Sequence, residues 1–561
     1  MTTIDTTETL YAAARAWRDD DPDPTTRAEL DAVLGRATAG DADAAADLAD
    51  RMAGLLEFGT AGLRGALGAG PNRMNRSVVI RAAAGLTAYL KDEGRAGDAP
   101  TVVVGYDARY NSDVFARDTA AVVVAAGGRA LLLPQPLPTP VLAFAIRHLG
   151  ADAGVMVTAS HNPPQDNGYK VYLGDGSQIV PPADARIAAH IGRVERVADV
   201  PRAADGWEML GDNLLEDYVD AVVGVVDPSS PRDLRVVHTS LHGVGHGTVH
   251  TAFVQAGFAA PVVVDEQAVP DPDFPTVAFP NPEEKGAIDL ALARARAVGC
   301  DLVIANDPDA DRCAAAVLDP ALGDWRMLRG DEVGALLGAH IVRRGVSRRD
   351  VFANSIVSSR LLASIAKAAG LAHEETLTGF KWISRVDRLR YGYEEALGYC
   401  VAPQLVRDKD GVSAALLLAE LAATLKAQGR TLIDQLDDLA VEHGVHATDS
   451  FSVRVSDLAQ TDTLMGRLRA EPPASVAGVE VDRIDDLARG DGGLPPTEGL
   501  RYHLVDRSRV IVRPSGTEPK VKVYLEVIEP VAGPAALGES RALAETRLAR
   551  VRADMERLTS L

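Results

Sequence analysis

Cysteine is scarce in this chain. Its 561 residues include three cysteines, Cys300, Cys313 and Cys400, and no two of them form a Cys-x-x-Cys pair. An odd number of widely spaced cysteines argues against a disulfide framework and is typical of proteins in a reducing compartment. We therefore expect a cytoplasmic protein.

Long apolar runs and an excess of positive charge are also absent. No segment approaches about 18 consecutive apolar residues, and Met1–Asp21 is polar and acidic, so we expect neither a membrane span nor a signal peptide. The 79 acidic residues outnumber the 58 basic ones, and the formal net charge is −21. Because a phosphate backbone needs a basic face, we expect no nucleic-acid partner. Small anionic ligands are not excluded, since local Arg, Lys and backbone N–H clusters bind them.

Several common catalytic motifs are missing. The sequence has no Walker A loop, no Gly-x-Ser-x-Gly elbow and no zinc-ligand spacing. Gly243–Gly247 follows a predicted strand, and Asp265 lies about 20 residues on, as in a dinucleotide fingerprint. The third glycine of that fingerprint would fall at Thr248, so a tight strand-to-helix turn is the preferred interpretation. An NAD(P)-dependent oxidoreductase stays open as an alternative from another class, and His242 is expected to have a hydrogen-bonding role.

The length and the element pattern indicate several domains. A soluble globular composition, with 47% hydrophobic and 24% charged residues, and a length of 561 residues suggest roughly three to five domains. Strands and helices alternate along most of the chain, which predicts parallel α/β units, whereas the C-terminal part alternates like antiparallel strands. We predict α/β architecture with a helical extension (1–45), three related α/β domains (46–210, 211–328, 329–445) and a C-terminal α+β domain (446–561).

The predicted elements are as follows. Strands are expected at Thr101–Tyr106, Arg129–Leu133, Ala153–Val157, Leu234–His238, Pro261–Val264, Leu302–Ala305 and Val351–Ile356, and helices at Ser112–Ala126 and Thr248–Ala256. Asp271–Glu284 is predicted to be a surface connection, Thr376–Tyr399 a loop, and Phe451–Val455 and Tyr502–Glu526 antiparallel strands.

Two loops carry the strongest chemical signals. Thr158–Pro163 follows a buried strand and places Ser160 where ligands bind in open α/β sheets. Asp307–Arg312 also follows an apolar strand, and its three alternate carboxylates can converge on one hard divalent cation. Each loop alone has a plainer interpretation, a polar turn or a solvated acidic loop. Together they provide a serine nucleophile and a metal site, which are the parts that phosphoryl transfer needs most.

Three weaker signals lie in the second half of the chain. Arg513–Lys520 can cradle an anion or form a hairpin turn with surface charges. The acidic pair that begins at Glu394 can accept hydrogen bonds from sugar hydroxyls or be solvated, and Lys381 can meet a phosphate or be a surface lysine.

Four of these loops follow one another along the chain: Thr158–Pro163, Asp307–Arg312, Glu394–Gly398 and Arg513–Thr517. With these loops in this order, the chain resembles the α-D-phosphohexomutase superfamily over nearly its whole length. The resemblance implies a heart-shaped arrangement of four domains around a central cleft. It implies that Ser160 carries the phosphoryl group and that Mg²⁺ is held by the Ser160 phosphate and by Asp307, Asp309 and Asp311. It further implies roles near the transferring phosphate for Arg64, His161, Lys170 and Arg312, a sugar-hydroxyl acceptor at Glu394, and a clamp on the other phosphate formed by Arg513, Ser515, Gly516 and Thr517.

The implied activity is a Mg²⁺-dependent phosphosugar mutase that uses a phosphoserine and is activated by glucose 1,6-bisphosphate. Its partner is a small phosphosugar, with glucose expected first and mannose next, and the protein is expected to be a monomer or homodimer. The sugar loop departs from the best-known subgroups, because Ala396 stands where they have serine. This feature resembles phosphopentomutases and glucose 1,6-bisphosphate synthases, which remain alternatives.

Overall fold

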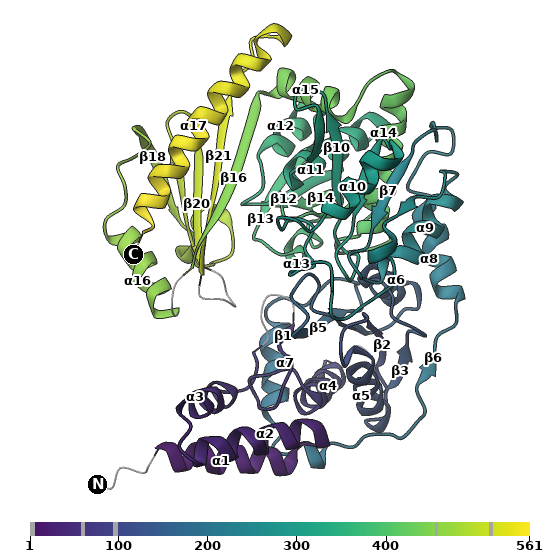
Figure 1. The fold of residues 1–561 in the computed structure, drawn as a ribbon, viewed down its shortest axis with the longest axis vertical. Coiled ribbons are helices and arrows are strands. Elements are labelled where there is room, and N and C mark those ends of the chain that lie inside the picture. The colour runs from purple at the N-terminus through teal and green to yellow at the C-terminus, as the bar shows by residue number, and fades with distance from the viewer. Residues whose placement is uncertain (1–5, 58–61, 94–98, 455–457, 515–519, 561) are drawn as a thin grey trace. The chain divides into compact units, whose positions relative to one another are not determined.

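The computed structural model describes residues 6–57, 62–93, 99–454, 458–514 and 520–560. The chain forms two compact units, and many of their elements are labelled in Figure 1. Unit 1 contains Met1–Ala316 and Ala402–Leu417, and unit 2 contains Val317–Val401 and Leu418–Leu561. The chain therefore leaves unit 1 and later returns to it for one short segment.

Within the described ranges, no helix is both long and apolar enough to cross a membrane. The cytoplasmic location stays a prediction.

Three helices precede the first sheet of unit 1: α1 (Thr6–Asp20), α2 (Pro24–Thr38) and α3 (Ala42–Arg51). Asp23 and Asp41 are the N-caps of α2 and α3, and each carboxylate accepts a hydrogen bond from a backbone N–H of the first turn. Such a bond satisfies a donor that has no partner inside the helix. Buried leucines and alanines of the three helices form a core cluster of their own.

The first sheet of unit 1 has six strands in the order β1-β5-β4-β2-β3-β6. The central strands β2, β3 and β4 run parallel and are largely buried, which explains their apolar sequences. β5 runs antiparallel to β4 and brings Lys170 opposite Met156 near the carboxyl end of that strand. The elements are β1 (Leu63–Ala66), α4 (Arg76–Asp92), β2 (Thr101–Tyr106), α5 (Ser112–Ala125), β3 (Arg129–Leu132), α6 (Thr139–His148), β4 (Ala153–Val157), β5 (Asp166–Leu173), α7 (Ala183–Gly192) and β6 (Glu208–Met209).

A second sheet of unit 1 has the strand order β11-β10-β9-β7-β8, counting the edge strand β11 that follows the unit boundary. Strands β7, β8 and β9 are parallel and β10 is antiparallel to β9. The elements are α8 (Asn213–Val223), β7 (Val236–Thr239), α9 (Gly245–Gln255), β8 (Val262–Val263), α10 (Asp289–Val298), β9 (Leu302–Ala305) and β10 (Ala314–Asp319). The boundary between the units falls inside β10, and β11 (Asp324–Met327) follows in unit 2.

Unit 2 begins with a four-stranded sheet in the order β13-β12-β14-β15. The elements are α11 (Gly330–Arg344), β12 (Val351–Ser355), α12 (Leu361–Ala368), β13 (Ala372–Thr376), α13 (Phe380–Ile383), β14 (Leu389–Glu394), β15 (Gly398–Cys400), α14 (Gly411–Ala427), which starts in unit 1, and α15 (Leu432–His443). The prediction of a loop over Thr376–Tyr399 is wrong, because this segment contains α13, β14 and the start of β15. Buried Tyr391 and Tyr393 lie two residues apart on β14, and this apolar spacing favours a strand.

The C-terminal sheet is antiparallel with the strand order β16-β21-β20-β19-β18-β17. The elements are β16 (Val445–Arg454), α16 (Leu458–Ala470), β17 (Ser475–Val476), β18 (Val479–Asp486), β19 (Leu500–Leu504), β20 (Arg509–Pro514), β21 (Lys520–Glu529) and α17 (Leu537–Leu558). Helix α17 packs against β16 and β21 (Figure 1). Three α/β domains and a C-terminal α+β domain are thus confirmed, while the domain boundaries stay predictions.

Buried Glu526 of β21 joins the two sheets of unit 2. Its carboxylate accepts hydrogen bonds from Arg360 Nε (2.6 Å), from Arg360 N (2.8 Å) and from Ser359 Oγ (2.9 Å). His446 Nδ1 and an Arg509 nitrogen lie 3.1 Å from its oxygens. Burial raises the pKa of Glu526, but Arg509, His446 and Arg360 outweigh burial and hold that pKa well below its usual range. This carboxylate, whose oxygens both have donors from the protein, fixes the C-terminal sheet to the α/β domain.

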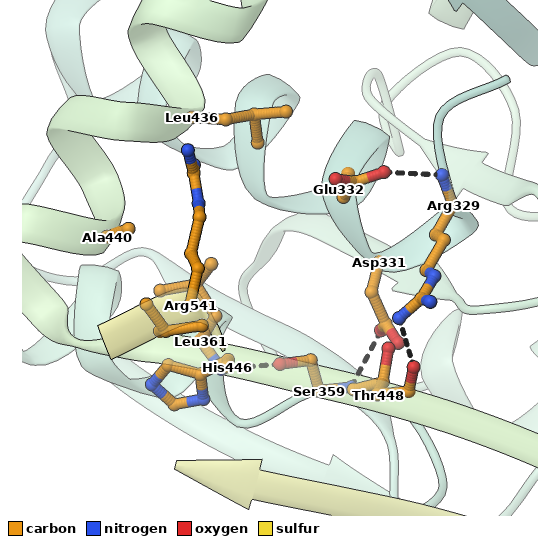
Figure 2. A pocket seen from close by; sticks show the side chains of 11 residues that line it. Arg329, Asp331, Glu332, Ser359, Leu361, Leu436, Ala440, His446, Thr448 and Arg541 are labelled. Carbon is orange, nitrogen blue, oxygen red and sulfur yellow. Dashed lines mark hydrogen bonds between the residues drawn. The ribbon is translucent and has the colours of Figure 1, made fainter. Parts of the chain in front are cut away.

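A small pocket of about 110 Å³ lies beside this connection, at the start of α11 (Figure 2). Figure 2 shows Asp331 joined to Ser359, and Arg329 joined to Thr448. Asp331 also accepts a hydrogen bond of 2.8 Å from the Tyr393 hydroxyl. Burial raises the pKa of Asp331 to about 7, and the charges of Glu395 and Glu526 act in the same direction.

We predict that Asp331→Asn makes unit 2 less sensitive to pH. The pKa of Asp331 is about 7 in the folded protein and near its ordinary value of 3.8 when unfolded, so between these values the folded state binds more protons and stability falls as pH rises. Asparagine keeps the acceptor oxygen and removes the charge. Thermal unfolding at pH 5 and pH 8 gives the difference in melting temperature between the variant and the wild type at each pH. This difference, variant minus wild type, should be more positive at pH 8 than at pH 5 by about 3 °C or more.

Asp506→Asn is the matched control in the same unit. The pKa of Asp506 is lowered, since the Ser508 and Arg547 hydrogen bonds outweigh burial, so this group is ionised in both states between pH 5 and 8. Its loss should lower stability equally at both pH values. The same pH dependence for Asp331→Asn and wild type would contradict the prediction.

Candidate active site

The serine loop follows β4 at the carboxyl end of the first sheet. Ser160 is almost fully buried and has a left-handed φ of 53°. Such a conformation in a non-glycine residue costs about 1–3 kcal/mol and persists only when its surroundings enforce it. One such contact is the 2.9 Å hydrogen bond from Ser160 N to Thr158 Oγ1. The strained loop aims the Ser160 hydroxyl away from β4 and toward the second sheet of unit 1.

The acidic loop follows β9 of that sheet. The Ser160 hydroxyl donates a hydrogen bond of 2.8 Å to Asp307 Oδ2. Asp307, Asp309 and Asp311 are each fully buried, and one oxygen of each lies within 4.8 Å of the others. Two loops that are nearly 150 residues apart in the sequence thus contact each other.

Three basic side chains face this buried acidic cluster. Lys170 Nζ lies 2.7 Å from Asp309 Oδ2 and 2.9 Å from Asp311 Oδ2. Lys409 Nζ lies 3.2 Å from Asp311 Oδ2, and Arg312 Nε lies 3.6 Å from Asp307 Oδ2. Burial lowers the pKa of Lys170, but Asp309 and Asp311 outweigh it and raise that pKa above its usual value.

The pKa values of Asp307 and Asp311 are shifted in opposite directions. Burial, followed by the charges of Asp309 and Asp311, raises the pKa of Asp307 well above its ordinary value. Burial also raises the pKa of Asp311, but Lys170, Lys409 and Arg312 outweigh it and hold that pKa low. Asp307 is therefore the carboxyl group whose charge is least compensated by the protein.

The cluster fits a divalent cation. Asp309 Oδ1 and Asp311 Oδ1 are buried, and neither accepts a hydrogen bond from the described part of the chain. Burying carboxylate oxygens without donors is costly, and a hard cation that prefers oxygen ligands would offset this cost. These two atoms, with an oxygen of Asp307, are ligands of the kind that could hold a divalent cation.

Arg64 and His161 lie at the same site. Arg64 Nη1 donates a hydrogen bond of 3.2 Å to Asn162 Oδ1 of the serine loop. His161 Nδ1 lies 3.4 Å from Ser160 Oγ. Burial, followed by the charges of Arg312 and Arg64, lowers the pKa of His161 well below 6.5. The imidazole is therefore neutral beside the serine hydroxyl.

Lys409 was not predicted from the sequence. It lies in the segment Ala402–Leu417, by which the chain returns to unit 1. Asp408 Oδ2 anchors this segment to β5, because it accepts hydrogen bonds from Tyr172 (2.7 Å) and Gln178 (2.6 Å). Gly411 packs so closely that a Cβ there would lie 2.3 Å from the Arg312 carbonyl oxygen. The signal that could have found Lys409 is the charged run Arg407–Asp410 directly before a glycine and an apolar helix.

The glycine-rich loop Gly243–Gly247 supports the acidic loop. Val244 N donates a hydrogen bond of 2.8 Å to the Pro308 carbonyl. A Cβ on Gly243 would lie 2.2 Å from Pro308 Cα, so only glycine fits there. The tight turn into α9 (Gly245–Gln255) therefore explains Gly243 without a dinucleotide. His242, predicted to form hydrogen bonds, lies 2.7 Å from Thr276 Oγ1 through Nε2.

The predicted sugar and phosphate residues lie in unit 2. Glu394 Oε1 accepts a hydrogen bond of 2.6 Å from Gly379 N, and Arg513 Nη1 donates one of 2.5 Å to Thr378 Oγ1. The two predicted loops thus contact one strand-to-helix connection. Lys381 is mostly buried, with its Nζ 5.6 Å from the centre of the Trp382 ring. Ala396 follows the acidic pair, and Ser515, Gly516 and Thr517 lie outside the described residues.

Comparisons with known proteins give matches over most of the chain. Four family models match in order: Phosphoglucomutase/phosphomannomutase alpha/beta/alpha domain I (residues 55–197), domain II (216–320), domain III (329–442) and the C-terminal domain (452–532). The chain is 48% identical to the "Probable phosphomannomutase" of Haemophilus influenzae, over 81% of this chain and 93% of that one. It is 37% identical to the phosphopentomutase of Mus musculus, over 85% and 84%. A solved structure from Thermus thermophilus, assigned as a phosphomannomutase, has a TM-score of 0.68 and 27% identity over 87% and 99%.

Gly243→Ala should destabilise unit 1 and weaken its metal site. The added Cβ would collide with the Pro308 backbone, which cannot move without shifting Asp307 and Asp309. Overpacking of this kind lowers the free energy of unfolding by about 1–3 kcal/mol, which urea unfolding measures as a lower midpoint. The affinity of unit 1 for a divalent cation should fall as well. Gly247→Ala is the matched control, since its Cβ would meet nothing within 4 Å and should change stability by less than about 1 kcal/mol. Equal midpoints for the two variants would show that the Pro308 contact is unimportant.

Proposed function

The chain belongs to the phosphoglucomutase/phosphomannomutase family, and on this basis we propose that it is a Mg²⁺-dependent phosphosugar mutase. It interconverts sugar 1-phosphates and 6-phosphates through a phosphoserine at Ser160 and a sugar bisphosphate. Glucose is the first expected sugar and mannose the next, with glucose 1,6-bisphosphate as activator. The observation that carries the proposal is the contact of the Ser160 hydroxyl with the buried carboxylate cluster.

The arrangement suits phosphoryl transfer, which depends on positioning and charge neutralisation more than on covalent chemistry. Asp307, Asp309 and Asp311 would hold Mg²⁺, and the bound ion would neutralise charge on the phosphoryl oxygens. Arg312, Lys170 and Arg64 supply further positive charge from the protein, and Lys409 adds to it through Asp311. His161, neutral and beside Ser160, assists proton transfer.

In unit 2, Glu394 is the proposed acceptor for sugar hydroxyls, and Lys381 lies in the same region. Arg513, with Ser515, Gly516 and Thr517, is the proposed clamp for the phosphate that is not reacting. The 2.5 Å contact between Arg513 and Thr378 supports this pairing, because Thr378 adjoins Gly379, whose N–H binds Glu394. One clamp must hold either end of the bisphosphate in turn.

The choice of sugar has a second candidate. Ala396 offers no hydroxyl to a sugar, and phosphopentomutase is among the similar proteins, so a pentose phosphate or a bisphosphate-synthase reaction is the alternative. A panel of glucose, mannose, glucosamine, ribose and deoxyribose 1-phosphates, each with catalytic glucose 1,6-bisphosphate, separates these activities. A failure of every sugar in the panel would overturn the proposed function.

Ser160→Ala should abolish mutase activity and leave the fold intact, because no other nucleophile occupies the predicted position. Intact-mass analysis after incubation with glucose 1,6-bisphosphate should find one phosphate on the wild type and none on the variant. Ser177→Ala is the matched control, since Ser177 is also buried in unit 1 and its Oγ has no hydrogen-bond partner in the described residues. It should keep both activity and phosphate. Wild-type activity in Ser160→Ala would rule out the phosphoserine.

Asp309→Asn should weaken Mg²⁺ binding at least about tenfold, equivalent to about 1.4 kcal/mol, and lower kcat. The substitution removes one of three charges that bind the cation, and isothermal titration calorimetry measures the affinity directly. Asp118→Asn serves as the control, because Asp118 forms a partly buried ion pair with Arg76 (2.7 Å) elsewhere in unit 1. It should lower stability without changing Mg²⁺ affinity. Full wild-type activity after exhaustive chelation would disprove the metal's role.

A further inference from the structure

Arg109 is a buried arginine beneath the serine loop and has no role in the function proposed above. It lies between β2 (Thr101–Tyr106) and α5 (Ser112–Ala125), with 4% of its surface exposed. Its guanidinium donates hydrogen bonds to three backbone carbonyls of the serine loop and one of β5: Ser160 O (2.7 Å), Asn162 O (2.6 Å), Pro163 O (2.8 Å) and Asp166 O (3.2 Å). One side chain thus binds the loop from its nucleophile to the start of β5.

These bonds constrain the residue that carries the nucleophile. The Ser160 carbonyl accepts from Arg109, while the Ser160 N–H donates to Thr158 Oγ1, so both peptide groups of Ser160 are fixed. Rotating the strained Ser160 backbone toward an ordinary conformation would break the contact with Arg109. Because a guanidinium has a planar array of five N–H donors, it can serve several carbonyls at once, which an ammonium group cannot do in the same geometry.

The guanidinium is itself held from two sides. Arg109 Nε lies 3.3 Å from Asp107 Oδ2, while Asp107 Oδ1 accepts hydrogen bonds from Arg109 N and Ser112 Oγ. On the other side, the guanidinium lies 5.0 Å from the centre of the Phe274 ring. Phe274 is buried, and it belongs to the connection that follows β8 in the second sheet's domain. Arg109 is therefore held between the serine loop and the domain that bears the acidic loop.

We propose that Arg109 is a positioning residue for phosphoryl transfer, which fixes the Ser160 backbone so that Oγ stays aimed at Asp307 and at the incoming phosphate. This inference rests on the proposed function. The step it serves is the transfer of a phosphoryl group from a sugar bisphosphate to Ser160. The bond from phosphorus to the sugar oxygen breaks, a bond from phosphorus to Ser160 Oγ forms, and the serine proton ends on the released sugar hydroxyl.

The test measures the rate of this step in the full-length protein. Dephosphorylated enzyme is mixed with glucose 1,6-bisphosphate and Mg²⁺, and the gain of phosphate on Ser160 is followed by intact mass. Arg109→Met should slow phosphate uptake and lower kcat by about 10–100-fold, because small displacements of a reacting atom have effects of this size. KM should change by less than about threefold, since Arg109 acts on the nucleophile and not on the bound sugar.

Arg232→Met is a matched control in the same unit. Its guanidinium also donates to several carbonyls, among them Ala256 O (2.7 Å) and Asp227 O (2.7 Å), and lies 4.8 Å from the Phe258 ring centre. This control should lower the melting temperature while phosphate uptake stays at the wild-type rate. A purely structural role for Arg109 would give the same result as Arg232→Met, and uptake within twofold of that control would overturn the inference.

Arg109→Lys keeps the positive charge, and it tests the positioning role of Arg109 if the methionine variant does not fold. Lysine cannot bond all four carbonyls, so uptake should still be at least about tenfold slow at a near-normal melting temperature. Wild-type uptake in a folded Arg109→Lys variant would overturn the inference and leave the proposed function standing. If the wild type itself takes up no phosphate and shows no mutase activity, the proposed function fails first.

Discussion

The constraint on which unit 1 depends is the burial of three carboxylates at the end of one short strand. Moving a charged carboxylate out of water costs several kcal/mol, and three together also repel one another. Asp307, Asp309 and Asp311 are nevertheless fully buried. The surroundings of the acidic loop follow from this cost: β5 supplies Lys170, the segment Ala402–Leu417 supplies Lys409, and Thr139 donates a 2.7 Å hydrogen bond to Asp309.

Unit 2 contains a buried carboxylate with different surroundings, and the two cases differ in how many carboxylate oxygens have donors from the protein. Glu526 is surrounded by donors from Ser359, Arg360, Arg509 and His446, so its charge is satisfied by the protein alone. In the acidic loop of unit 1, two carboxylate oxygens have no donor among the described residues. The first arrangement holds two sheets together. The second leaves two carboxylate oxygens without a hydrogen-bond donor from the described part of the chain, as the proposed cation site requires.

The sequence predicts local features of the site well and long-range ones poorly. Ser160 and the three aspartates could be found because each group follows an apolar strand in a short, recognisable loop. The alternation of strands and helices indicated the three α/β domains, but it did not indicate the antiparallel strand that each of their sheets contains. Lys409 and Arg109 were missed, since their partners lie far along the chain. Lys409 stands in a charged run before a glycine, but that run does not by itself indicate which carboxylate it meets.

Elsewhere a usable signal was overlooked. Tyr391 and Tyr393 have the two-residue spacing of a buried strand, yet the many charged neighbours of this segment favoured a loop. In the C-terminal domain, β16 begins at Val445, six residues before the predicted strand at Phe451. The prediction missed this first half because its side chains are all partly buried and do not alternate between buried and exposed. For Glu394 and Arg513, the sequence indicates the residue types, but which strand connections they contact depends on sheet packing.

The return of the chain to unit 1 has a consequence for how the protein is made. A ribosome releases the N-terminal part first, and domains generally fold as they emerge. The serine and acidic loops are complete once residue 316 has been synthesised, but the segment that carries Lys409 and anchors to β5 emerges only after β12, β13, β14 and β15. Until then Asp311 lacks one of its cationic partners and Tyr172 lacks Asp408. Final assembly of the first unit therefore waits for much of the second to be translated, and a fragment ending at Ala316 would contain the nucleophile without its finished surroundings.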